Sequence, residues 1–250
     1  MSVIPYFIFN DIDSRDMGVV VRALPPLVRP TERITQVTVP GRHGKLIMTE
    51  GDEPTYDNYT KTVDCYIRPD VDIAELLNWL RGSGKVIFSN DPEYAYSARI
   101  YSEISLEKIM RGHQHRAFSL SFLCDPCKEQ AIPDPAVSMA LVDSNNNDLT
   151  SGTLYNPGNI PARPLITVTV EGTLTLTVND VEFTVTDTNN GASATIKIDC
   201  DAEMATNADG TANLTSYTYG YFPTLVPGLN TIEWDGDLTA LTILPRWRWV

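Results

Sequence analysis

The fold of this chain is constrained most by short runs in which apolar and polar residues alternate with a period of two. Such alternation places apolar side chains on one face of a β-strand and polar side chains on the other. In the second half the runs are rich in threonine and valine, and they lie at 165–170, 174–178, 181–185, 195–198, 229–234 and 241–244. Turn residues separate them, and Asn179 and Asp180 form a two-residue hairpin loop. This spacing predicts an antiparallel β-sandwich.

The first half contains further alternating segments. Residues 61–67 and 118–124 each place apolar side chains on one face, which indicates half-buried sheet strands. Glycines supply the backbone freedom that chain reversals need, within residues 111–112 and within residues 40–44. We therefore expect a long hairpin over residues 98–124 and a second hairpin that turns at 40–44.

One amphipathic helix interrupts the strands of the first half. Apolar residues recur at helical spacing within residues 73–81, which is the helix that we predict. Asp72 and Glu75 match a capping box at its start. Gly82 follows the run, as glycine commonly does at a helix C-terminus.

A proline-rich stretch divides the chain. Residues 126–137 contain three prolines and no periodicity, which is typical of a linker. We therefore predict a mainly β protein of two domains. Residues 1–131 form an N-terminal β-sandwich with one α-helix and long hairpins, and residues 132–250 form a C-terminal antiparallel β-sandwich.

The formal net charge of −13 is unevenly distributed. Residues 1–131 hold 15 Lys and Arg against 18 Asp and Glu, whereas residues 132–250 hold 4 against 14. The acidic second half repels phosphate backbones, so we expect no direct binding of nucleic acid. The sequence shows neither a signal-peptide pattern nor a run of about 18 apolar residues, so we expect synthesis in a cytosol and no membrane span.

The four cysteines are too few and too irregularly spaced for a disulfide scaffold, which predicts free thiols. Cys124 and Cys127 have the spacing of metal ligands, with His113 and His115 as the remaining candidates. A zinc site needs four ligands, and no second cysteine pair is present. A strand end with small buried thiols is therefore the preferred interpretation.

No residue pattern predicts catalysis. Residues 82–85 resemble the end of a phosphate-binding loop, but Trp79 and Val86 occupy positions that such a loop gives to glycine and to serine or threonine. The acids within residues 11–16 do not match a calcium-binding loop. The three histidines lie outside any nucleophile motif. We therefore predict that the protein is not an enzyme, with no catalytic, cofactor-binding or metal-binding residue.

Aromatic residues mark the end of the chain. Tyr217, Tyr219 and Tyr221 alternate, which predicts that all three lie on one side of a strand. They form either a core between two sheets or a platform on which sugar rings stack. Residues 246–249 alternate arginine with tryptophan, which predicts a closing strand with one buried and one charged face.

A set of short motifs resembles the distal tail protein (Dit) family of siphophages and their prophages. The resemblance runs from residue 7 to residue 249, and the matched positions are 40–44, 79–89, 156–158, Pro164, 227–230 and 245–247. Each motif by itself is a turn or a packing position. The resemblance depends on their common order and spacing.

The resemblance implies a structural hub of a long non-contractile phage or prophage tail. It implies a first domain that assembles into a homo-hexameric ring, and a second, galectin-like domain. The ring would join the tail tube protein to the tail-associated fibre or lysin protein, with receptor-binding and tape measure proteins as further partners. The expected location is the tail tip of the virion, after synthesis in the bacterial cytoplasm.

Two groups of residues are candidate binding sites under this interpretation. Loops of a ring subunit reach its neighbour, so His43, Arg111 and His113 are the candidate ring-interface residues. The alternative function is a carbohydrate-binding module for attachment to the host surface. In that case Tyr217, Tyr219 and Tyr221 are the candidate sugar-stacking residues.

Overall fold

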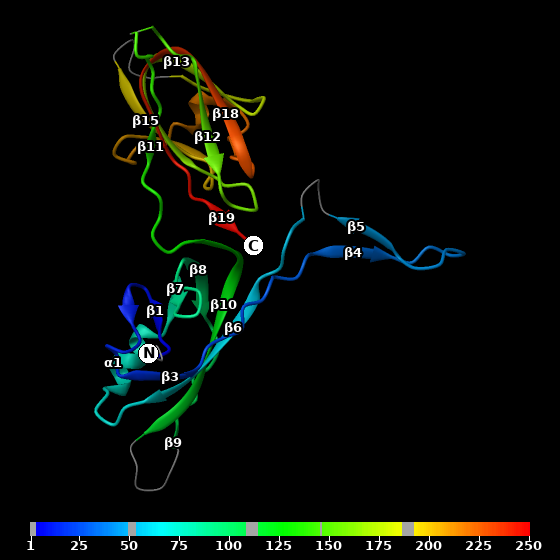
Figure 1. Cartoon of the computed structure of the whole chain (residues 1–250), viewed down its shortest axis with the longest axis vertical. Helices are drawn as coiled ribbons and strands as arrows, with labels where there is room; N and C mark the ends of the chain where they lie inside the picture. The colour runs from blue at the N-terminus through cyan, green and yellow to red at the C-terminus, as the bar shows by residue number, and fades with distance from the viewer. Residues whose placement is uncertain (1–3, 50–53, 109–114, 146, 187–192) are drawn as a thin grey trace. The chain divides into compact units, whose positions relative to one another are not determined.

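The computed structural model describes residues 4–49, 54–108, 115–145, 147–186 and 193–250 (Figure 1). The chain divides into two compact units, Met1–Ala131 and Ile132–Trp249. Antiparallel strands make up most of both units, and the described residues contain one α-helix. The prediction of a mainly β fold with a single helix is therefore confirmed. Within the described ranges, no helix combines the length and apolar character that crossing a bilayer requires.

A single antiparallel sheet curls around the core of the first unit. Its strands follow the order β2-β1-β7-β8-β10-β6-β3, and β9 pairs with β10. The strands are β1 (Phe7–Phe9), β2 (Ile12–Asp13), β3 (Val19–Ala23), β6 (Tyr59–Ile67), β7 (Gly82–Phe88), β8 (Tyr94–Ile100), β9 (Glu107–Lys108) and β10 (Arg116–Gln130).

The alternation that the sequence shows decides which face of this sheet is buried. In β6, Val63, Cys65 and Ile67 are buried, while the intervening residues are exposed or half-buried. The neighbouring strand β10 pairs in register and places Phe118 opposite Cys65. The prediction of half-buried strands at 61–67 and 118–124 is confirmed.

The helix α1 (Ile73–Trp79) closes the apolar side of the sheet. Its N-cap is Asp72, whose carboxylate accepts a hydrogen bond of 2.8 Å from the Ala74 amide, as the sequence predicts. The helix ends at Trp79, two residues before the predicted end. The Trp79 ring stacks on Phe7 with centroids 5.7 Å apart, and its Nε1 donates to the Phe9 carbonyl oxygen at 3.0 Å.

The second unit is built on two long strands. Its strands are β11 (Val137–Ser138), β12 (Ser151–Asn156), β13 (Leu165–Val178), β14 (Val181–Thr186), β15 (Ala194–Asp199), β16 (Met204–Asn207), β17 (Thr218–Gly220) and β18 (Gly228–Leu244), with β19 (Arg248–Trp249) near the end of the chain. A short 3-10 helix, η1 (Thr215–Tyr217), precedes β17.

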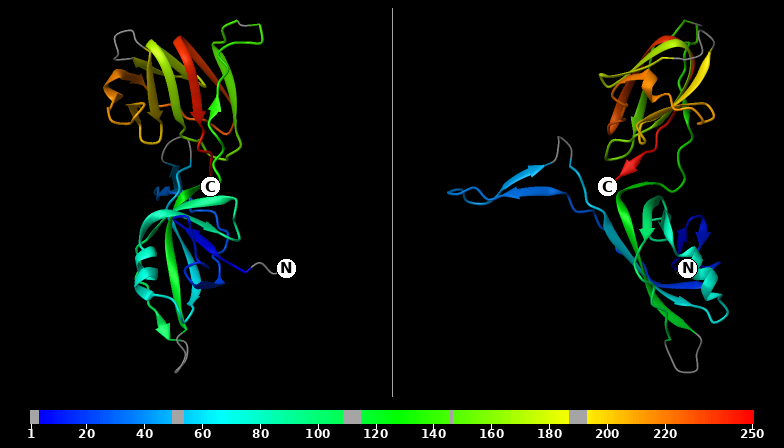
Figure 2. Two further views of the ribbon diagram at one scale, coloured as in Figure 1. Left: turned by 90° about the vertical axis from the view of Figure 1, so that its left-hand side faces the viewer. Right: turned by 180° about the vertical axis from the view of Figure 1, so that it is seen from behind.

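The bent strands β13 and β18 take part in two layers (Figure 2). One layer has the order β12, first half of β18, second half of β13, β14 and β17. The other joins β11, the second half of β18, the first half of β13, β15 and β16. Residues from both layers form one core. This arrangement corrects the prediction that 165–170 and 174–178, and likewise 229–234 and 241–244, are separate strands.

Two glycines allow these bends. Gly172 in β13 has φ of 80°, and Gly236 in β18 has φ of 131°. A Cβ atom at Gly236 would clash with the carbonyl oxygen of Thr173, so the two strands can cross this closely only with glycine there. The sequence contains the two glycines, but period-two alternation cannot distinguish a bend from a turn.

Other turns follow the predicted chemistry. Asn179 and Asp180 connect β13 to β14 with φ angles of 48° and 69°, as a two-residue hairpin turn requires. The Arg246 guanidinium makes two hydrogen bonds to the Asp199 carboxylate, at 2.7 and 3.0 Å. Trp247 is 5% exposed and belongs to the core. The predicted closing strand is present only at Arg248–Trp249, because Arg246 has φ of 54°, and Trp249 is half-buried.

Candidate assembly surfaces

A two-stranded hairpin, here called the arm, consists of β4 (Ile34–Val37), β5 (Leu46–Thr49) and the connection between them. The two strands pair only with each other among the described residues (Figures 1 and 2). The predicted turn at residues 40–44 is confirmed, and Gly41 and Gly44 both have φ of 79°. His43 lies in this turn and is exposed.

The arm exposes apolar side chains. All residues from 31 to 45 are exposed, and the arm carries five exposed large apolar residues, which are Ile34, Val37, Val39, Ile47 and Met48. Isolated two-stranded hairpins are marginally stable in water. A hairpin with this composition gains stability by burying its apolar side chains against another surface. The arm is therefore the strongest candidate for contact with another chain.

Polar contacts join the segment before β4 to the segment after β5 at the base of the arm. The Arg33 guanidinium forms an ion pair of 2.9 Å with the Asp57 carboxylate. A backbone bridge joins Glu32 to Tyr56, and the Arg29 side chain donates to the Tyr56 hydroxyl at 2.7 Å. These contacts hold the two legs of the hairpin together at its base but leave the apolar residues of the arm uncovered.

The second predicted hairpin is described only in part. β9 and the first residues of β10 pair, with Arg116 opposite Lys108. Arg111 and His113, between β9 and β10 in the sequence, lie outside the described residues. Of the three candidate ring-interface residues, the structure therefore places only His43.

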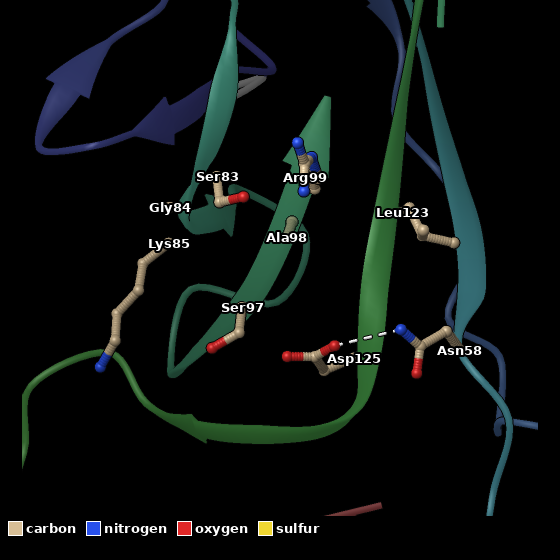
Figure 3. A pocket seen from close by; sticks show the side chains of 9 residues that line it. All are labelled: Asn58, Ser83, Gly84, Lys85, Ser97, Ala98, Arg99, Leu123 and Asp125. Carbon is tan, nitrogen blue, oxygen red and sulfur yellow. Dashed lines mark hydrogen bonds between the residues drawn. The ribbon is translucent and has the colours of Figure 1, made fainter. Parts of the chain in front are cut away.

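A polar pocket of about 470 Å³ opens where β10 separates from β8 (Figure 3). The two strands lose their register between Cys124 and Lys128. Figure 3 shows the Asp125 carboxylate and the Ser97 hydroxyl on either side of this opening. Asp125 accepts a hydrogen bond of 3.2 Å from the side-chain amide of Asn58.

Two lysines of the first unit pack against aromatic rings. Lys61 is 3% exposed, and its ammonium group lies 4.6 Å from the centre of the Tyr96 ring. Burial lowers the pKa of Lys61. Lys128 pairs with the Asp91 carboxylate at 2.9 Å, and the Tyr96 hydroxyl donates to the same carboxylate. Lys61 is therefore enclosed, whereas the Lys128 and Asp91 side chains keep 23% and 13% of their exposure.

Within the described ranges, no group of three or more His, Cys, Asp or Glu side chains is arranged to hold a metal ion. The cysteines are free thiols. Cys65, Cys124 and Cys200 are buried, and burial raises the pKa of each thiol to about 12. Such thiols are protonated at neutral pH and react slowly. His113, one of the histidines considered with Cys124 and Cys127, lies outside the described residues.

The three alternating tyrosines do not share a strand, which corrects the sequence prediction. Tyr217 is in η1, Tyr219 is in β17, and Tyr221 follows the strand. Their exposed fractions are 51%, 82% and 82%. They are therefore surface residues and not a core between two sheets.

Motifs that carry the family resemblance have structural roles. The side-chain amide of Asn156 donates to the Leu225 carbonyl oxygen at 2.8 Å, and its oxygen accepts from the Gly158 amide at 2.7 Å. Asn230 is fully buried and donates to the carbonyl oxygens of Val226 and Gly228 at 2.9 and 3.0 Å. The two asparagine side chains supply hydrogen-bond partners to backbone groups of the turns that have no backbone partner. Buried carbonyl groups need such partners.

No protein-family model and no curated protein matches this chain. Solved structures do match, and they define its fold as that of phage tail hub and baseplate proteins. One is the crystal structure of the Dit (gp 19.1) protein of phage SPP1, described as a paradigm of the hub adsorption apparatus in phages that infect Gram-positive bacteria. It has a TM-score of 0.72 and 16% identity, and the match covers 99% of this chain and 100% of that chain.

Two structures of the phage P2 baseplate in its activated conformation also match. The structure with Ca has a TM-score of 0.54 at 8% identity, and the structure with Sr has 0.55 at 7%. Each match covers 98% of both chains. The chain therefore has the fold of a phage distal tail protein, as its sequence predicts.

Proposed function

We propose that this protein is a structural hub of a long non-contractile phage or prophage tail. Copies of the chain form a closed, homo-hexameric ring, and the first unit provides the ring contacts. The ring joins the tail tube protein to the tail-associated fibre or lysin protein. Receptor-binding and tape measure proteins are further partners, and the location is the tail tip of the virion. The protein acts through its surfaces and has no catalytic role.

The single observation that carries this proposal is the fold match over the full length of both chains to the SPP1 Dit protein. The uncovered arm gives independent support. A ring subunit needs two different surfaces that fit each other around a closed rotation. A projecting hairpin with apolar residues on both faces supplies one of them, because Met48 pairs with Thr35 and Ile47 with Gln36 on opposite faces.

Assembly of the purified full chain tests the ring. We expect native mass spectrometry and negative-stain electron microscopy to show six-fold rings at high protein concentration. A double variant, Ile47→Asp with Met48→Asp, should stay monomeric, because burying two unpaired carboxylates opposes association. Val142→Asp is the matched control, since Val142 is 47% exposed and lies in the second unit. It should assemble as the wild type does.

Three results would contradict parts of the proposal. Wild-type protein that stays monomeric over the whole concentration range would exclude self-assembly by this chain. Full rings of the arm double variant would exclude the arm as the contact. A virion that lacks the gene product and is nevertheless complete and infectious would exclude the hub role itself.

A further inference from the structure

The second unit carries an open groove on the outward face of the layer that contains β12, β14 and β17. The groove has a volume of about 410 Å³, and its lining residues are Thr150, Ser151, Thr175, Thr177, Glu233, Trp234 and Asp235. It lies where β12, β18 and β13 run side by side, with Ser151 opposite Glu233 and Glu233 opposite Thr177. Three adjacent strands of one unit therefore build this groove.

The groove presents hydroxyl and carboxylate groups. Alternation sends Leu174 and Leu176 into the core and turns Thr175 and Thr177 outward. The side chains of Ser151, Thr177, Glu233 and Asp235 form no hydrogen bond or ion pair with another residue that the structure describes. These groups can therefore donate to or accept from a ligand without breaking an internal contact.

An exposed aromatic ring lies on the same face. Asp235 is opposite Thr175, Thr175 is opposite Thr184, and Thr184 is opposite Tyr219 across three successive strand pairs. Residues directly opposite each other in an antiparallel pair share one face. Neighbouring strands lie about 4.8 Å apart, so Tyr219 stands about 10 Å along the sheet from Thr175. The Tyr219 ring is 82% exposed.

The combination of groups favours one class of ligand. Sugar rings offer hydroxyls that pair with carboxylates and threonines, and an apolar face that stacks on an aromatic ring. Residues 132–250 hold 4 Lys and Arg against 14 Asp and Glu, and Glu233 and Asp235 line the groove itself. This charge repels phosphate-bearing polymers and tolerates neutral or amino sugars. The distance between groove and ring requires an oligosaccharide and not a single sugar.

We propose that this face binds a neutral or amino-sugar oligosaccharide. Tyr219 stacks on one sugar ring, and Glu233 and Asp235 accept hydrogen bonds from hydroxyls of another. The proposal goes beyond the hub function, because it gives the second unit a ligand of its own. It does not depend on ring formation, since the first unit contributes no residue to this face.

Glycan binding by the full-length protein tests the proposal. The probes are an array of neutral, amino-sugar and phosphodiester-linked oligosaccharides, followed by calorimetric titration with chitotetraose and maltotetraose. We expect binding to members of the neutral or amino-sugar set. Tyr219→Ala should weaken that binding about tenfold, whereas Tyr219→Phe should retain it within about twofold, because the ring and not the hydroxyl makes the contact.

The control is Tyr101→Ala, because Tyr101 is a tyrosine of the first unit that is 64% exposed. It should bind as the wild type does, and Glu233→Gln should weaken binding about fivefold. The proposal is overturned if no neutral or amino-sugar glycan binds, if only phosphodiester-linked glycans bind, or if Tyr219→Ala binds normally. Native mass spectrometry on the same samples reports ring formation separately, so failure of one proposal is distinguishable from failure of the other.

Discussion

The arm and the β13–β14 hairpin are both antiparallel pairs with β-branched residues, yet they differ in burial. Phe183 and Val185 in β14 are fully buried. In the arm, Ile47 is 60% exposed and Met48 is 51% exposed. The apolar side chains of β14 are covered by other strands of the same unit. Nothing among the described residues covers the apolar side chains of the arm, and under the proposed function a second chain would cover them.

The largest expected effect tests this difference in burial directly. Phe183→Ala should lower the free energy of unfolding by about 4 kcal/mol, because it removes a large ring from a packed core. Ile47→Ala should change the stability of the monomer by less than about 0.5 kcal/mol. Urea unfolding of monomeric protein, followed by tryptophan fluorescence and circular dichroism, measures both. A large loss in the Ile47 variant would show that the arm packs within its own chain.

The second prediction concerns the bend at Gly236, which lets β18 take part in both layers of the second unit. Gly236→Ala should cost about 3 kcal/mol, because φ of 131° is nearly restricted to glycine and the new Cβ meets the Thr173 backbone. Gly172→Ala is the matched variant. A Cβ atom there has open space, so it should cost only about 1 kcal/mol of backbone strain. Equal losses in thermal unfolding experiments would contradict this account of the bend.

The third prediction uses pH to probe the ion pair that anchors the end of the second unit. The two hydrogen bonds from Arg246 lower the pKa of Asp199 below its value in the unfolded chain, which is about 3.9. Its contribution to stability is therefore present above about pH 5 and is lost as the pH falls through the lowered pKa. Asp199→Asn should reduce stability by about 1 kcal/mol at pH 6 and by less at pH 3. Equal reductions at both pH values would contradict a role for the charge.

The smallest effect is expected at the base of the arm. Arg33 and Asp57 both have about half of their side chains exposed, so Arg33→Ala should change global stability by less than about 0.5 kcal/mol. Amide hydrogen exchange within residues 34–48 of the monomer should nevertheless become faster, because the base contacts limit local opening. Unchanged exchange would show that the arm is ordered without this ion pair.

Much of the local structure could be predicted from the sequence. The Asp72 cap, the Asn179–Asp180 turn and the turn at 40–44 each depend on the conformational preferences of a few neighbouring residues. Alternation also predicted the buried faces of β6 and β10, because it too depends only on neighbouring residues. The order of motifs along the chain also predicted the overall fold, because turn and packing positions recur in order among proteins with this architecture.

The candidate binding surfaces could not be predicted as well from the sequence. Tyr217, Tyr219 and Tyr221 alternate along the chain, but a 3-10 turn precedes β17, so the period-two rule does not hold for Tyr217. The groove near Tyr219 combines residues of β12, β13 and β18, three strands that are not continuous in the sequence. No local pattern could have indicated that these residues meet.

The sequence by itself determined the type of the strongly periodic elements, the buried faces of their strands and the acidic character of the second half. These properties follow from short-range periodicity and from summed charge. Only the tertiary structure decided that β13 and β18 bend and join two layers, that the arm remains uncovered, and that Tyr219 shares a face with the groove. Each of these depends on pairing between strands distant in the chain, and pairing is fixed by which apolar faces can be buried together.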